Sequence, residues 1–154
     1  MSIHWWKISF FAVLCQVTIC QVGIGQDIRW NFSAHSGGGS EITLLLTADL
    51  TAGWHIYSQH IQEGGPVATH IAFASDTAYT TTGETQEQGN ETRYYDSLYE
   101  MEIGWYADQV SFSQRIILKQ PIRFIKGTIT YMICNKEVCV PKEEKFKIDI
   151  FSQG

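Results

Sequence analysis

The sequence predicts an all-β domain, an immunoglobulin-like antiparallel β-sandwich, that follows an N-terminal signal peptide. Three observations predict this class. Apolar residues alternate with polar ones in several short segments, clusters of Gly, Asn and Asp separate these segments, and no stretch after Gln26 keeps an apolar period of 3.6 residues. Alternation with a period of two indicates half-buried strands, and seven or more such strands with frequent turns are typical of a sandwich.

The first 25 residues have the character of a signal peptide. Lys7 supplies a positive charge ahead of the uncharged apolar run 8–19, and the small residues Gly23 and Gly25 follow it. The run has the length of a signal-peptide core and is short for a membrane span. We therefore expect an exported protein with one domain over residues 26–154, with a retained N-terminal membrane anchor as the alternative.

The strands are expected from their own alternation, in chain order. The first two place Ile28, Trp30 and Phe32, then Ile42, Leu44 and Leu46, at alternate positions on either side of a glycine-rich turn. Further strand candidates are residues 54–58, 70–74, 110–118, 127–134 and 145–151. Segment 80–106 does not alternate, and we expect a long irregular region there whose aromatic second half packs onto the domain. Loops of that length tend to be functional or disordered.

Two cysteines remain after the predicted signal peptide, Cys134 and Cys139, and a pair in an exported chain is most simply one disulfide. Segments 127–134 and 145–151 predict a hairpin whose mouth is CNKEVC, where facing residues lie close enough for this bond. Ile133 and the alternate apolar positions before it should face the core, so Cys134 should point away from it. Such a short loop stabilises less than the roughly 3 kcal/mol of a fifteen-residue loop. We therefore expect an outward-facing disulfide that is exposed to solvent, which suits exchange with another thiol better than a structural role.

Other readings of the cysteine pair stay open from the residues alone. An exported binding module could contain a purely structural disulfide, and a zinc site would need His55, His60 or His70 as further ligands. Thioredoxin-like catalysis is disfavoured because four residues separate the cysteines and no βαβ pattern is present. A net charge of −5 without a basic stripe disfavours nucleic acid as a partner. We expect neither a cofactor nor a metal.

Three segments resemble a known family. The run GTITYMICNKEVCVPKEE at 127–144, with GWHIYS at 53–58 and YYDSLYE at 94–100, is similar to the N-terminal periplasmic domain of the thiol:disulfide interchange protein DsbD, the disulfide bond corrector family. The resemblance implies an immunoglobulin-like monomer with one redox-active cysteine pair in the periplasm. It implies that a membrane-embedded thiol reductase donates electrons to this pair. Thioredoxin-like proteins and disulfide isomerases, including cytochrome c maturation proteins, would then accept them.

The same resemblance implies roles for single residues. Cys139 matches the cysteine that forms mixed disulfides with partners, and Cys134 matches the cysteine that resolves them. The cap loop that shields the pair corresponds to Asp96, Ser97, Leu98, Tyr99 and Glu100, and Tyr57 and Tyr99 match aromatic residues that line the site.

The chain also departs from the family pattern. It has one residue fewer between the cysteines, Pro141-Lys142 in place of Pro-Pro, and Leu98 where a larger aromatic is usual. No membrane domain or thioredoxin-like domain follows before Gly154, so either these parts are separate proteins or this domain has acquired a different partner.

Overall fold

The computed structural model describes residues 27–151, and the predicted signal peptide lies outside this range. The described part is built of eight strands: β1 (Ile28–Gly38), β2 (Glu41–Leu50), β3 (His55–Tyr57), β4 (His70–Phe73), β5 (Tyr79–Asp96), β6 (Met101–Leu118), β7 (Phe124–Cys134) and β8 (Cys139–Asp149). Across residues 27–151 there is no helix of the length and apolar character needed to cross a membrane.

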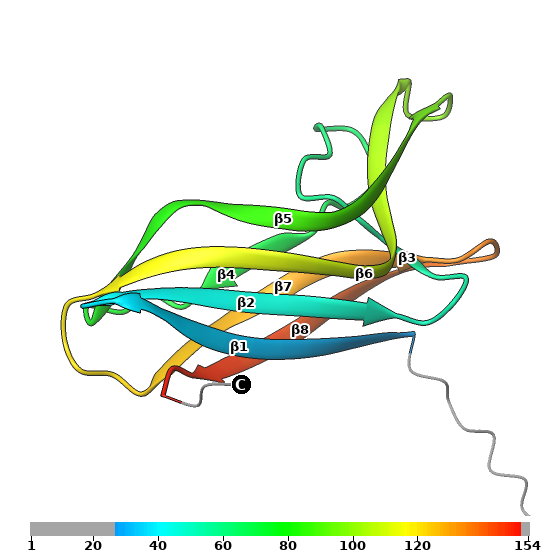
Figure 1. Cartoon of the computed structure of the whole chain (residues 1–154). Helices are drawn as coiled ribbons and strands as arrows, with labels where there is room; N and C mark the ends of the chain where they lie inside the picture. The colour runs from blue at the N-terminus through cyan, green and yellow to red at the C-terminus, as the bar shows by residue number, and fades with distance from the viewer. Residues whose placement is uncertain (1–26, 152–154) are drawn as a thin grey trace, which may run out of the picture.

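The strands form one antiparallel sheet that curls into two layers (Figure 1). Its order is β1-β2-β6-β3-β7-β4, with β5 added to β6 and β8 added to β7. β1, β2, β6 and β5 make one layer, β8, β7 and β4 make the other, and β3 bridges them by pairing with both β6 and β7. β1 also contacts β8, so edge strands of the two layers meet there. The predicted all-β antiparallel class is confirmed.

The core lies between the two layers and follows the alternation in the sequence. In β2 every second residue from Ile42 to Leu50 is buried. Phe112 of β6, the register partner of Leu46, and Ile129 of β7 belong to the same core cluster and have no exposed surface. The predicted glycine turn connects β1 to β2, where Gly38 and Gly39 adopt positive φ angles of 99° and 60°. Such angles cost glycine little because it has no Cβ.

The two long strands, β5 and β6, change their pairing at the same level of the sandwich. β6 pairs with β2 through residues 109–117 and with β3 through residues 105–107, and Asp108 between them has a φ of 59°. β5 shifts its register against β6 at the same level, between Gly89 and Glu91. Residues 91–106, which we call the hairpin arm, therefore turn away from the sandwich (Figure 1).

The prediction of an irregular region over residues 80–106 is wrong. These residues form most of β5 and the start of β6, and residues 97–100 alone make a turn. The physical reason is that β5 lies at the edge of its layer with most of its side chains exposed. An edge strand held by backbone hydrogen bonds needs no apolar alternation, so its sequence gives no strand signal. The strands are accordingly longer than the short ones expected.

Candidate redox site

The disulfide joins the two strands of the β7–β8 hairpin next to its turn. Cys134 ends β7 and Cys139 begins β8, the two are register partners, and their Cα atoms lie 4.1 Å apart. The turn between them is held by Asn135, whose Oδ1 accepts hydrogen bonds from the backbone N–H of Glu137 at 2.8 Å and of Val138 at 2.9 Å. The predicted hairpin and its disulfide are thus both present.

The two sulfurs have opposite environments. Cys134 is 1% exposed, whereas Cys139 is exposed. Cys134 does point away from the main core, as strand parity predicts, but the expectation that it is therefore open to solvent is wrong. A second, smaller apolar cluster covers it, formed by Tyr57 and Ile103 with Ile61, Met101, Trp105 and Met132 packed around them. Part of this cover comes from the hairpin arm, which strand parity within β7 cannot reveal.

The Tyr57 side chain places a polar group beside the buried sulfur. Its hydroxyl lies 3.7 Å from the Cys134 Sγ, and it acts as the donor because a disulfide sulfur carries no proton. Burial raises the pKa of Tyr57, and the nearby Tyr99 and Asp96 raise it further. The hydroxyl therefore keeps its proton well above neutral pH and remains available to the sulfur.

The backbone around Tyr57 is fixed from two sides. The hydroxyl of Thr69 donates a 2.6 Å hydrogen bond to the Tyr57 carbonyl oxygen. The N–H of Ser58 donates to the carbonyl oxygen of Gly104 on the hairpin arm, at 3.0 Å. β3 is three residues long, so these contacts hold its end in place.

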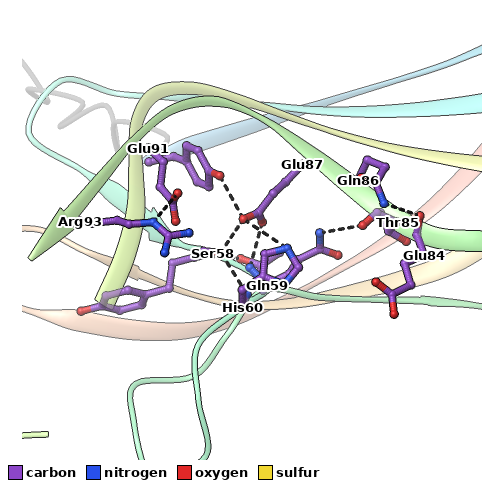
Figure 2. Close-up of polar contacts among 12 residues, drawn as sticks. Ser58, Gln59, His60, Glu84, Thr85, Gln86, Glu87, Glu91 and Arg93 are labelled. Atoms are coloured by element: carbon purple, nitrogen blue, oxygen red, sulfur yellow. Dashed lines mark hydrogen bonds and ion pairs between the residues drawn. The ribbon is translucent and has the colours of Figure 1, made fainter. Parts of the chain in front are cut away.

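A buried carboxylate on β5 completes this support (Figure 2). Glu87 accepts hydrogen bonds from the Ser58 hydroxyl, from the Gln59 N–H at 2.9 Å and from the Tyr106 hydroxyl at 3.0 Å, and its side chain is 7% exposed. The His60 Nε2 lies 3.8 Å from the same carboxylate. Burial and the Glu87 charge together raise the pKa of Tyr106. Sequence reasoning missed Glu87, because nothing distinguishes it from the other carboxylates of this polar strand.

Asp96 organises the tip of the hairpin arm. Its Oδ1 accepts the backbone N–H of Leu98 at 2.8 Å and that of Tyr99 at 3.3 Å, and its Oδ2 accepts the Tyr94 hydroxyl at 3.0 Å. The hydrogen bond from Leu98 is the main reason why the pKa of Asp96 is lowered. Burial, followed by the hydrogen bond to Asp96, raises the pKa of Tyr94 to about 12.

The residues expected to form a cap loop occupy this tip. Ser97 and Glu100 are exposed, Glu100 has a φ of 54°, and Leu98 is 81% exposed. The structure therefore brings Cys134, Cys139 and Tyr57 together, and places Asp96 and Tyr99 near enough to Tyr57 to act on its pKa. It does not lay the Leu98 side chain over the disulfide.

The three histidines considered as zinc ligands have different neighbours and do not form one site. His55 is the register partner of Cys134, His60 contacts Glu87, and His70 pairs with Thr130 on the other part of β7. Within residues 27–151, no three His, Cys, Asp or Glu side chains gather in a way that could hold a metal ion.

Comparison with protein families identifies the chain's relatives. The family model described as "Thiol:disulfide interchange protein DsbD, N-terminal" matches residues 24–149. The chain belongs to this family. Among curated proteins, none matches in a sequence comparison.

Two solved structures show the same fold. The N-terminal periplasmic domain of ScsB from Proteus mirabilis matches with a TM-score of 0.52 and 20% identity, over 82% of this chain and 47% of that one. This chain thus spans about half the length of the ScsB structure. The second is a complex of the DsbD and PilB N-terminal domains from Neisseria meningitidis. It matches with a TM-score of 0.53 and 13% identity, over 82% of this chain and 84% of that one. These likenesses support the immunoglobulin-like sandwich that the sequence predicts.

Proposed function

We propose that this DsbD N-terminal family member is a thiol–disulfide interchange domain that passes reducing equivalents to exported partner proteins through Cys134 and Cys139. The observation that carries the proposal is the asymmetry of the pair, in which a buried sulfur is bonded to an exposed one. An attacking thiolate can reach Cys139 and is sterically kept from Cys134. Exchange therefore has one entry point, and this gives the two cysteines different roles.

Reduction of the pair begins when a donor thiolate attacks the Cys139 Sγ in line with the S–S bond. A donor–Cys139 disulfide forms, and the electron pair of the broken bond leaves on the Cys134 Sγ. The Tyr57 hydroxyl, 3.7 Å from this sulfur, is placed to donate a hydrogen bond to the new thiolate. The donor's second thiolate then attacks its own sulfur in the mixed disulfide and releases Cys139 as a thiolate. Two electrons have entered, and the donor leaves as a disulfide.

Delivery is the same sequence in reverse. The Cys139 thiolate attacks the disulfide of an acceptor and forms a mixed disulfide, and one acceptor sulfur leaves as a thiolate. Cys134 then attacks the Cys139 Sγ, restores the intramolecular disulfide and releases the second acceptor sulfur. The β7–β8 ladder holds Cys134 opposite Cys139, so this second step needs no large movement of the chain.

The tip of the hairpin arm, with Asp96, Ser97, Leu98, Tyr99 and Glu100, is proposed to be the cap loop of the site. Leu98 is 81% exposed and Tyr95 is 65% exposed, so the tip offers apolar surface that a docked partner would bury. Tyr99 and Asp96 act on the pKa of Tyr57, which supports a place for the tip beside the pair. Movement of such a tip on docking would gate access to the sulfurs.

The donor is proposed to be a membrane-embedded thiol reductase, and the acceptors to be thioredoxin-like or disulfide isomerase proteins, cytochrome c maturation proteins among them. The solved complex between DsbD and PilB N-terminal domains supports a protein acceptor. The similar ScsB structure is a periplasmic domain, which supports export through a signal peptide at residues 1–25. The proposal includes a single domain over residues 26–154 that acts as a monomer in the periplasm.

A redox titration tests the proposal. The purified protein is equilibrated in buffers of fixed potential, and the free thiols are trapped by alkylation and counted by mass. A midpoint above about −300 mV is expected, because structural disulfides resist reduction until lower potentials. If the pair stays oxidised throughout that range, the proposed transfer of reducing equivalents is wrong, and the disulfide is structural.

A further inference from the structure

An apolar pocket of about 370 Å³ lies close to the disulfide, because it is lined by His55, the register partner of Cys134, and by Asn135, the residue that follows Cys134. The pocket is lined by Trp54, His55, Trp105 and Ala107, together with Asn135 and Lys136 of the β7–β8 turn. This volume is at the low end of the roughly 300–1,000 Å³ of small-molecule sites. It suits one or two side chains better than a large ligand.

The two tryptophans that line the pocket are partly exposed, although each packs on buried residues of the domain. Trp54 packs on the main core and Trp105 on the second cluster, and both are half-buried. The His55 ring lies 4.7 Å from the Trp105 ring and 5.5 Å from the Tyr57 ring, so it is held between them. Burial lowers the pKa of His55, which keeps the ring neutral at neutral pH. The aromatic walls of the pocket are thus uncharged and packed on buried residues, and aromatic surface of this kind is enriched at binding hot spots.

The pocket and the redox pair share one face of the sheet. His55 is the register partner of both Cys134 on β7 and Ala107 on β6, and directly opposed residues point to the same side. Asn135, which fixes the turn carrying the exposed Cys139, also lines the pocket. A protein that brings a sulfur to Cys139 from this face therefore comes close to the pocket as well.

We propose that this pocket receives an aliphatic or aromatic side chain of the acceptor protein, from a residue within three positions of the acceptor's reactive cysteine. The inference rests on the proposed function. The limit of three positions follows from the distance between the exposed sulfur and the pocket. Cys139 on β8 is two strand spacings, about 10 Å, from His55 on β3. An extended chain covers that distance in about three residues. Burial of this side chain should favour acceptors that carry it by about tenfold.

Short peptides of defined sequence test the inference. Each carries one cysteine as a mixed disulfide with 2-nitro-5-thiobenzoate, with Leu, Trp or Ser at one of the three positions on either side. The Cys139 thiolate of the reduced protein attacks the peptide sulfur and releases coloured nitrothiobenzoate. The rate of this release is measured by absorbance. The best apolar peptide should react about tenfold faster than its Ser counterpart. The mixed disulfide of glutathione with 2-nitro-5-thiobenzoate, which has no apolar side chain beside its cysteine, provides the reference rate.

Filling the pocket provides the matched control. Ala107→Phe and the smaller Ala107→Leu should bring the ratio of apolar to Ser peptide rates close to one without changing the glutathione rate. Ala107→Ser, which adds little volume, should keep the ratio. A ratio near one in the unaltered protein at every position overturns the pocket inference, and so does an apolar preference that survives both filling variants. If the unaltered protein reacts with neither glutathione nor any peptide, the proposed function itself is overturned.

Discussion

Replacing Tyr57 with Phe should slow the opening of the disulfide about tenfold. The change removes one hydroxyl group, which lies 3.7 Å from the Cys134 Sγ. Cys134 is 1% exposed, so the thiolate that leaves there has little access to water. A hydrogen bond to a charged group contributes roughly 1.5–3 kcal/mol. The long distance to sulfur places this bond at the lower end of that range, and about 1.4 kcal/mol corresponds to a factor of ten in rate.

The assay is the reduction of the oxidised protein by excess dithiothreitol, followed by alkylation at timed intervals. Tyr79→Phe is the matched control, because Tyr79 is also buried and donates its hydroxyl to the Ala74 carbonyl oxygen. Both variants should lose about 1 kcal/mol of unfolding free energy, and Tyr57→Phe alone should lower the rate. The raised pKa of Tyr57 keeps its hydroxyl protonated from pH 6 to 9, so the rate ratio should not vary there. Equal reduction rates for the two variants would refute the reasoning.

Two further predictions concern the carboxylates. Glu87→Gln should lower the unfolding free energy, measured in urea, by about 2–3 kcal/mol, because an amide has one acceptor oxygen and leaves a part-buried donor such as the Gln59 N–H unpaired. Glu84→Gln, at an exposed position on the same strand, should change it by less than about 0.5 kcal/mol, and equal losses would contradict the anchoring role. The pKa of Asp96 is lowered chiefly by the Leu98 N–H, so its turn should be fully formed at neutral pH and loosen as pH falls through that lowered value. The Leu98 amide resonance should therefore titrate below about pH 4 and stay flat in Asp96→Asn, whereas a midpoint above the ordinary aspartate value would count against this.

The sequence was sufficient to predict the strands in which apolar and polar residues alternate. Leu44 and Leu46 on β2 and Ile129 on β7 fall on core positions because one face of each strand is buried and the other is not. The CNKEVC hairpin could be predicted for a similar reason, since apolar parity on both sides of the turn sets the register that places Cys134 opposite Cys139.

The rest of the site depends on tertiary contacts that local patterns do not encode. The hairpin arm was not predicted, because edge strand β5 is held through its backbone and carries polar residues on both faces. The burial of Cys134 follows from Ile103 on that arm, some thirty residues earlier in the chain. The alternation of His55 and Tyr57 around Ile56 did contain the signal that these two rings share a face.

The central claim is that Cys139 meets partners while Cys134 is shielded, and single-cysteine variants test it most directly. Cys134→Ser and Cys139→Ser are each reacted with 5,5′-dithiobis(2-nitrobenzoate) at neutral pH, in the folded state and in urea. The remaining Cys139 should react as an open thiol. The remaining Cys134 should react at least about 100-fold more slowly until the protein is unfolded, because the arm must first open. Equal rates in the folded state, or a faster Cys134, would contradict the account.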